Sequence, residues 1–560
     1  MNEYDICIIG SGAGGGPVAL TLAQAGASVV VLEKGPWYTE KTFFKDEKGD
    51  VYYTPNLRDE QHVVEQRDED DAWTSQPTSE SGWSFWNGNM VGGSSNLMSG
   101  FFTRLKPDDF RLRSAFGEIK GANVVDWPIS YEDLEPYYAK VESVVGISGR
   151  VVPHPFAEPR STPDFPYPPT QEHFLSKVVD RACEQLGHHS LPLPRAVLSR
   201  TDPSQGTRQS CQYSGYCGSY GCASGAKGSA RAALLDHAVK TGHCDIRPHA
   251  KVQRLISDNQ GKVTAAEYVD AKGSTQTIRA KVFVVACQAI ETSRLLLLST
   301  GPKHAQGLGN QSGQVGKNLI FSAGGAGRGE FRYAKFPPEQ ARELKLIGPF
   351  VDRHVQDWYF YDDPKTKRRI KGGTIDFLLR HPDAIARAQS FRRDSEGKLV
   401  WGSLLKQRLL QDFTETQSLD FEVFNDWLPT DDCYVTLDGK VKDKWNTPVA
   451  KMRLNAHPHD LVVGEYLAKK GEEIMRAMGA ENVSSSVSDS PPANLVAGGC
   501  RFGKDPKTSV LDPDCRVHTA ENVFVTDGSF MPTGGSVPYT WTIYANAFRV
   551  ADIIKKQMAL

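Results

Sequence analysis

The chain has 560 residues, of which 39% are hydrophobic and 24% charged, the balance of a globular protein too large for one ordinary core. Lys and Arg number 65 against 67 Asp and Glu, so the formal net charge of −2 favours neither nucleic acid nor an anionic membrane surface. No apolar run reaches the roughly 18 residues of a membrane span, and the first residues lead straight into a strand without the features of a signal peptide. These features exclude disordered, fibrous and membrane-spanning proteins and predict two closely joined domains.

The first predicted elements form a βαβ unit. A short apolar strand over residues 4–9 is followed by the glycine-rich turn 10–16 and a helix over 17–25, which begins at a proline. A β-branched strand over residues 28–32 then ends on Glu33. Residues 38–83 are polar and acidic, which predicts a long excursion at the surface.

The later elements return to the same pattern. Turn signals between short strands predict a β-meander over residues 245–286, followed by a helix over 290–298. A strand over 523–526 and a helix over 540–556 close the chain. The fold class is therefore α/β, with a Rossmann-like dinucleotide-binding domain and a second α+β domain built on a mostly antiparallel sheet. We assign residues 1–150, 205–320 and 490–560 to the first domain, and residues 151–204 and 321–489 to the second.

The turn after the first strand carries Gly10-x-Gly12-x-x-Gly15 between a strand and a helix, the context that a dinucleotide-binding fingerprint requires. The first glycine permits the tight turn, the second lets the backbone approach a pyrophosphate, and the third allows close packing of helix and strand. Glu33 ends the second strand and is placed to accept hydrogen bonds from a ribose. A nicotinamide enzyme would share this fingerprint, but NVFVTDGSFMP (522–532) places an acid directly after a strand, which favours a buried flavin.

Several ordered segments resemble the glucose–methanol–choline (GMC) oxidoreductase family, whose members depend on FAD. They include GSGAGGG (10–16), NMVGGSSNLMSGFFTRLKPDDF (89–110), VVACQAIETSRLLL (284–297) and CRFGKDPKTSVLDPDCRVHTAENVFVTDGSFMPTGGSV (500–537). The sequences of these segments are most similar to the bacterial branch of the family, which contains the large subunits of gluconate, fructose and glucose dehydrogenases. The resemblance implies that the FAD-binding positions are Gly10, Gly12, Gly15, Glu33, Gly92, Gly93, Ser94, Asn96, Val252, Asp527 and Gly528.

The catalytic positions depart from the family pattern. Members usually carry a histidine just before a GTxRxG-like segment, with a second His or Asn near the C-terminus, and the first accepts the substrate proton. Counting back from Arg501 places Leu495 in the histidine position, and one inserted residue would place Asn494 there. The second position falls on Pro538, followed by Tyr539. We therefore take Asn494 and Tyr539 as the candidate catalytic residues, with His457 and His459 of the second domain as another source of a base.

Three cysteines form one tight cluster, Cys211, Cys217 and Cys222, spaced C-x5-C-x4-C in a glycine-rich loop. Such a loop can wrap an iron–sulfur cluster, and three ligands would suit a 3Fe–4S cluster. Related dehydrogenases carry a cluster in the corresponding loop, but their last spacing is one residue shorter. The alternatives are free thiols in a packed loop, a disulfide, or a zinc site that lacks its fourth ligand.

The resemblance implies an FAD-dependent dehydrogenase that oxidises a CH–OH group of a sugar, polyol or sugar acid by hydride transfer to flavin N5. It also implies an acceptor other than NAD, with a small subunit and a cytochrome c as partners. The alternatives are a flavoprotein of this fold whose activity is non-oxidative or lost, and an oxygen-using sugar or alcohol oxidase. The expected location is the cytoplasm, or the periplasm through co-export with a partner subunit.

Overall fold

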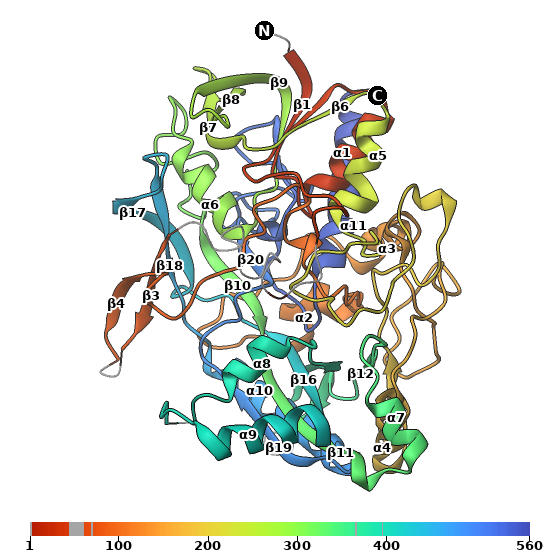
Figure 1. Ribbon diagram of the computed structural model, residues 1–560. Coiled ribbons are helices and arrows are strands. Elements are labelled where there is room, and N and C mark those ends of the chain that lie inside the picture. Colours follow the sequence, from red (N-terminus) through yellow and green to blue (C-terminus); the bar gives the residue numbers. More distant parts are fainter. Residues whose placement is uncertain (1–2, 44–46, 48–60, 69–70, 364–366, 395) are drawn as a thin grey trace.

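The computed structural model describes residues 3–43, 47, 61–68, 71–363, 367–394 and 396–560 (Figure 1). One end of the molecule holds a largely parallel sheet with helices α1 and α11, and the opposite end holds an antiparallel sheet with helix α10. The predicted fold class, a Rossmann-like domain with a second α+β domain, is confirmed. Residues 44–46, 48–60 and 69–70 of the predicted surface excursion lie outside the described residues.

The first sheet is built around β1 (Glu3–Ile9), which is parallel to β2 (Val29–Leu32) on one side and to β9 (Thr275–Val285) on the other. Ile6 pairs with Val29 and with Val282. The run of buried β-branched residues suits a strand that is covered on both faces. The strand order is β6 (Cys244–Arg247), β2, β1, β9, β8 (Val263–Val269) and β7 (Lys251–Ser257), with β21 (Val523–Val525) beside β9. The predicted meander corresponds to β7, β8 and β9, which pair antiparallel.

Helices from the two ends of the sequence share the core beside this sheet. α1 (Gly15–Gln24) packs against α11 (Thr540–Gln557), and nine of its ten residues are buried. On α11, Trp541 stacks on Phe102 with ring centroids 5.9 Å apart and meets Tyr138 edge-on at 5.5 Å. The other helices around this core are α3 (Tyr131–Val141), α5 (Asp236–Lys240) and α6 (Ala289–Leu298).

The second sheet has strand order β19 (Glu481–Val487), β11 (Gly325–Arg332), β16 (Thr416–Asp426), β15 (Gly373–Leu379), β12 (Arg353–Val355) and β5 (Leu191–Pro192). A further strand, β10 (Lys317–Ala323), joins β16 to β20 (Val496–Gly499). All of these pairs are antiparallel. One face, which includes Phe421 and Val423, packs with α10 (Pro458–Ala477) and α4 (Phe174–Leu186) in one apolar cluster. The alternate residues of β16 therefore face the first domain.

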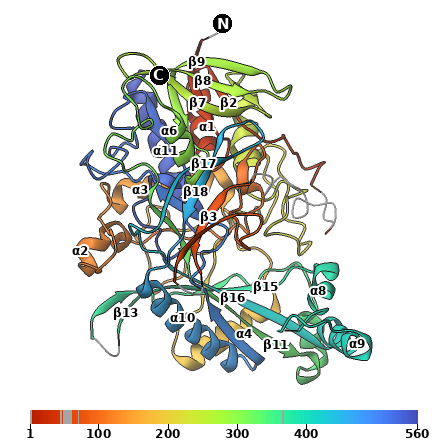
Figure 2. The same cartoon turned by 90° about the vertical axis from the view of Figure 1, so that its left-hand side faces the viewer.

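A four-stranded sheet connects distant parts of the chain. β17 (Tyr434–Lys442) pairs with β18 (Pro448–Arg453), which lies parallel to β3 (Val63–Arg67), and β3 pairs with β4 (Trp73–Pro77). Figure 2 shows β17, β18 and β3 at the front of the molecule between the two larger sheets. The remaining elements are β13 (Phe360–Asp362), β14 (Arg369–Lys371), α2 (Leu112–Phe116), α7 (Pro338–Leu344), α8 (Ala384–Ser390) and α9 (Gly402–Leu410).

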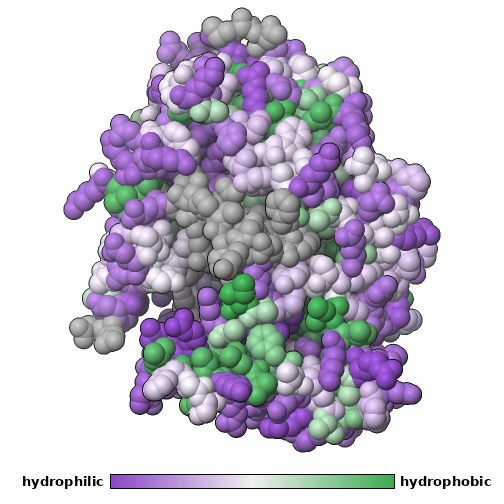
Figure 3. Space-filling model, in the orientation of Figure 1, coloured by the Kyte–Doolittle hydropathy of each residue, from purple (hydrophilic) through white to green (hydrophobic). Residues whose placement is uncertain are grey.

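Apolar side chains gather on the surface over α8 and α9 (Figure 3). Trp401, which precedes α9, is 77% exposed, and Leu404 on α9 is 49% exposed. α9 has no fully buried residue, and Leu410 at its end is 48% exposed. Among the described residues, no helix combines the length and the apolar character needed to cross a bilayer.

Candidate active site

A cavity of about 410 Å³ lies between the two large sheets. The glycine-rich turn after β1 and the end of β2 line one part of it, and residues of β15, β16 and the loop after β15 line another. Segments 86–101, 494–496 and 538–543 form much of the wall between these two parts. One space therefore runs from the dinucleotide-binding turn to the second sheet.

The three fingerprint glycines have different surroundings. Gly10 has φ +94°, and a Cβ there would lie 2.3 Å from the carbonyl oxygen of Ala286. A Cβ on Gly15 would lie 2.1 Å from the carbonyl oxygen of Gly10, so this glycine permits the contact between helix and strand. A Cβ on Gly12 would meet only the Cα of Gly93, at 3.8 Å, within the protein. Gly10 and Gly12 line the cavity, whereas Gly15 packs behind it.

Glu33 is buried at the end of β2 and lines the cavity. Its carboxylate accepts hydrogen bonds from Ser11 Oγ at 2.6 Å and from the Gly35 N–H at 3.0 Å. Burial raises the pKa of Glu33, while these bonds act in the opposite direction. Val252, at the start of β7, lines the same part of the cavity. Glu33 and Val252, two of the predicted FAD-binding positions, thus lie around one space.

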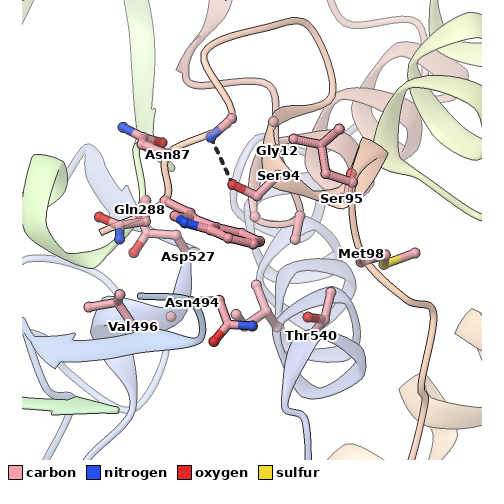
Figure 4. A pocket seen from close by; sticks show the side chains of 18 of the residues that line it. Gly12, Asn87, Ser94, Ser95, Met98, Gln288, Asn494, Val496, Asp527 and Thr540 are labelled. Carbon is pink, nitrogen blue, oxygen red and sulfur yellow. Dashed lines mark hydrogen bonds between the residues drawn. The ribbon is translucent and has the colours of Figure 1, made fainter. Parts of the chain in front are cut away.

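In the predicted FAD-binding loop 92–96, some residues line the cavity and others hold the loop in shape. Gly93 and Ser94 line the cavity, and Ser94 Oγ accepts the Gly88 N–H at 2.9 Å, the bond drawn in Figure 4. Gly92 has φ +94°, and its N–H donates to Ser11 Oγ at 2.9 Å. The Asn96 amide donates to the carbonyl oxygens of Val91 and Gly93 at 2.9 and 3.1 Å. Gly92 and Asn96 do not line the cavity, so they hold the loop in shape.

Asp527 and Gly528 follow β21 and line the middle of the cavity. Asp527 accepts hydrogen bonds from the Thr292 hydroxyl and, at 2.8 Å, from the Ser529 N–H. Gln288, close to Asp527 in Figure 4, uses its amide oxygen to cap α6, while its buried Nε2 has no hydrogen-bond partner among the described residues. An unpaired donor beside a carboxylate, with an open approach to Gly12, fits the polar groups of a flavin dinucleotide.

Both candidate catalytic residues line the cavity, but they have different surroundings. Asn494 is exposed and lies across the cavity from Ser94 in Figure 4, near Thr540. Tyr539 is fully buried, and its hydroxyl donates to the carbonyl oxygen of Leu495. Burial raises the pKa of Tyr539 well above its usual value. Leu495 has φ +53°, a left-handed conformation that is strained for a leucine. Tyr539 is thus placed to hold this turn.

His457 and His459 do not line the cavity. His457 caps α10 by accepting the His459 N–H at Nδ1, and its Nε2 lies 3.0 Å from the carbonyl oxygen of Lys120. Two other ionisable residues, His381 and Glu422, line the cavity from the second domain. The sequence signal for Glu422 was an acid within the alternating pattern of β16, which the motif analysis did not use.

The predicted metal site is not supported. Cys211, Cys217 and Cys222 line a small cavity of about 30 Å³, which suits one or two water molecules. Across the described part of the chain, no group of three His, Cys, Asp or Glu side chains is arranged to hold a metal ion. Burial raises the pKa of Cys211 to about 11. The ten cysteines all lie among the described residues and none forms a disulfide, so no disulfide joins the three.

A lysine holds the cysteine-bearing loop instead. Lys227 is buried, and its ammonium group donates to the carbonyl oxygens of Asn96, Cys217 and Tyr220 at 3.1, 2.8 and 2.7 Å. These three bonds tie the loop to the 92–96 segment at the cavity wall. Direct bonds from a buried cation therefore hold this loop in the structure.

Comparison with known proteins agrees with this geometry. Family models described as GMC oxidoreductase match residues 74–322 and 429–547, and one described as an FAD binding domain matches residues 5–68. The chain belongs to the GMC oxidoreductase family. It binds FAD and acts as an oxidoreductase on CH–OH donors.

Two relatives and one solved structure illustrate the similarity. The chain is 31% identical to a 2-methyl-1,2-propanediol dehydrogenase of Mycolicibacterium austroafricanum, over 100% of this chain and 96% of the relative. It is 25% identical to a fructose dehydrogenase large subunit of Gluconobacter japonicus, over 98% of this chain and 97% of the relative. A formate oxidase variant of Aspergillus oryzae shares the fold, with a TM-score of 0.64 and 14% identity. The match covers 100% of this chain and 99% of the formate oxidase chain. Relatives named as oxidases are also found.

Proposed function

We propose that this GMC oxidoreductase is a dehydrogenase that oxidises a CH–OH group of a sugar, polyol or sugar acid and passes the electrons to an acceptor other than NAD. The observation that carries the proposal is the single cavity, which joins the dinucleotide-binding turn to a wall supplied by the second sheet. FAD, when bound, supplies a hydride acceptor at N5. The protein residues supply position and proton handling.

The residues of the cavity divide these tasks. Gly12 gives the pyrophosphate access to the backbone, and Glu33 faces the same part of the cavity. Asn494 offers an amide that can hydrogen-bond a substrate oxygen but cannot take its proton at neutral pH. On the opposite wall, Phe424 and Leu378 offer apolar surface beside Glu422, a combination that suits the mixed faces of a polyol. A small subunit and a cytochrome c acceptor belong to the proposal, supported by the similarity to a dehydrogenase large subunit.

The test is anaerobic mixing of the FAD-loaded protein with D-fructose, D-gluconate, D-sorbitol and 2-methyl-1,2-propanediol, each followed by loss of the flavin absorbance. We expect at least one of these alcohols to reduce the flavin. Reduction by dithionite but by none of the alcohols would instead support a flavoprotein of non-oxidative or lost activity.

The acceptor is tested on the protein after substrate reduction. We expect cytochrome c or a redox dye to reoxidise the flavin faster than oxygen does. Faster reoxidation by oxygen, with formation of hydrogen peroxide, would favour the oxidase alternative. Fractionation of the source cells with antibody detection tests the proposed cytoplasmic location against co-export to the periplasm.

A further inference from the structure

Oxidation of an alcohol requires a group that accepts the hydroxyl proton, and the usual histidine position holds Leu495. Asn494 has no basic nitrogen. Tyr539 already donates its hydroxyl proton to the Leu495 carbonyl oxygen, and its raised pKa opposes the phenolate form. On the wall that the second domain contributes, the ionisable residues are His381 and Glu422. The proton acceptor is therefore to be sought on this wall.

The strand register of β16 sends Glu422 toward the cavity. Its neighbours Phe421 and Val423 enter the apolar cluster under α10, and successive side chains of a strand point to opposite faces. Glu422 and Phe424 accordingly both line the cavity. The Glu422 side chain is half-buried because solvent reaches it through this space.

A row of ionisable residues crosses the sheet beside Glu422. Asp376 on β15 pairs directly with Glu422, and His354 on β12 pairs directly with Asp376. Asp376 is fully buried, and neither of its carboxyl oxygens has a hydrogen-bond partner among the described residues. His354 Nδ1 lies 3.8 Å from Asp376 Oδ1, too far for a hydrogen bond. The row therefore places no bonded cation beside Glu422.

The other charged groups near this row are engaged elsewhere. On β11, Arg328 binds both carboxylate oxygens of Asp420, at 2.7 and 3.2 Å. Arg380, after β15, lies 4.0 Å from the same carboxylate. Arg195 pairs with Asp352. The paired strand β19 contributes serines at this level of the sheet.

We infer that Glu422 is the catalytic base of this enzyme. As the substrate is oxidised, its O–H and C–H bonds break and a C=O bond forms. The proton would go to the Glu422 carboxylate, and FAD held by the dinucleotide-binding turn would accept the hydride with its two electrons. This inference rests on the proposed function and adds the residue that takes the proton.

The electrostatics of the row suit this role. Burial, with a smaller contribution from Asp420, raises the pKa of Glu422 to about 7, close to the range in which a general base is most effective. Burial and the neighbouring Glu422 raise the pKa of Asp376 well above its usual value, which favours the neutral acid at this position. Burial lowers the pKa of His354 to about 3, which leaves its imidazole neutral.

His381 is the rival base. Its Nδ1 lies 3.1 Å from the carbonyl oxygen of Gly215, and its ring meets Tyr220 edge-on at a centroid distance of 5.6 Å. These contacts hold the ring against the loop that carries the three cysteines. We therefore assign His381 to the wall of the cavity and include it as a variant in the test.

The experiment compares Glu422→Gln, His381→Asn and Asp376→Asn in the FAD-loaded protein, with the alcohol that reduces the wild-type flavin fastest. Flavin content and Tm confirm that each variant is folded. We expect Glu422→Gln to slow flavin reduction by about 100-fold or more and to abolish its rise with pH near 7. Asp376→Asn, which replaces a neutral acid by a neutral amide, should keep the wild-type pH profile.

A second readout does not depend on turnover. Infrared titration of the FAD-loaded protein should show a protonated carboxyl band that disappears near pH 7 in the wild type and in Asp376→Asn, but is absent from Glu422→Gln. A Glu422→Gln variant with the wild-type rate and pH profile would overturn the inference. The inference would also fail if the rise of the reduction rate near pH 7 were lost in His381→Asn but kept in Glu422→Gln. A wild-type flavin that no alcohol reduces would instead overturn the proposed function and the inference with it.

Discussion

Alanine substitution at two glycines of the same turn should affect different properties, because one glycine faces the cavity and the other faces the strand. The first substitution should weaken FAD binding, and the second should lower the stability of the fold. A Cβ on Gly15 would lie 2.1 Å from the Gly10 carbonyl oxygen, about 1.3 Å short of the 3.4 Å at which ordinary contact begins. Overpacking of this kind costs about 1–3 kcal/mol. With a shift of about 2–4 °C per kcal/mol, Gly15→Ala should lower the Tm of the apoprotein by about 2–12 °C.

Gly12→Ala should leave the fold intact, because its Cβ would meet protein only at 3.8 Å. The methyl group would instead occupy the space through which the pyrophosphate approaches the backbone. We expect the affinity for FAD to fall by at least about tenfold, equivalent to about 1.4 kcal/mol. The assay is quenching of flavin fluorescence on titration of apoprotein with FAD, together with the Tm of each apoprotein. A Gly12→Ala variant that binds FAD as the wild type does would refute the assignment of this turn to the pyrophosphate, and an unchanged Tm in Gly15→Ala would refute the packing argument.

Four further predictions test other parts of the molecule. The purified protein should contain flavin without iron, so an iron assay that finds about three irons per chain would contradict the reading of the cysteine loop. Lys371 Nζ lies 2.6 Å from both Asp109 and Asp426, and all three residues are buried, so Lys371→Met should destabilise the fold by about 3–5 kcal/mol and clearly lower the Tm. The control Lys470→Met, which removes a partly exposed pair with Glu473, should change stability by less than about 1 kcal/mol. Tyr539→Phe should lower the Tm by removing the bond to Leu495 but leave the pH dependence of flavin reduction unchanged, and a shift of that dependence would contradict a supporting role. Because the folded-state pKa of Glu422 is raised to about 7, its ionisation costs stability increasingly between the unfolded pKa of about 4.3 and pH 7. The Tm of Glu422→Gln relative to wild type should therefore increase from pH 5 to pH 8, and a constant difference would contradict the raised pKa.

The Rossmann-like part of the fold could be predicted from sequence because its signals are local. The strand at 4–9, the glycine turn and the helix that follows are contiguous, and the structure has them as β1 and α1 within one or two residues at most boundaries. The four-stranded sheet was not predicted, because β3 and β18 pair across most of the chain and carry no shared motif. The division of residues between the two domains stays a prediction.

The site shows the same division between local and distant signals. The fingerprint glycines and Glu33 meet in one cavity because the βαβ geometry brings them together. The cysteine spacing suggested a metal site, but spacing could not reveal that Lys227 ties the loop through three carbonyl groups.

Glu422 was missed for a different reason. In TQSLDFEVFND (416–426), Leu419, Phe421 and Val423 alternate with Asp420 and Glu422, which predicts a strand with one apolar and one polar face but not what the polar face meets. A polar face of this kind usually meets water, whereas here it closes a cavity that reaches the glycine-rich turn after β1 and the end of β2. The register of β16 against β15 then places Asp376 beside Glu422, and this long-range pairing adds to the burial that raises the pKa of Asp376. A base supplied by the second sheet would explain how an enzyme of this family could lack the usual histidine, because the proton acceptor would reach the substrate from the opposite wall of the same cavity.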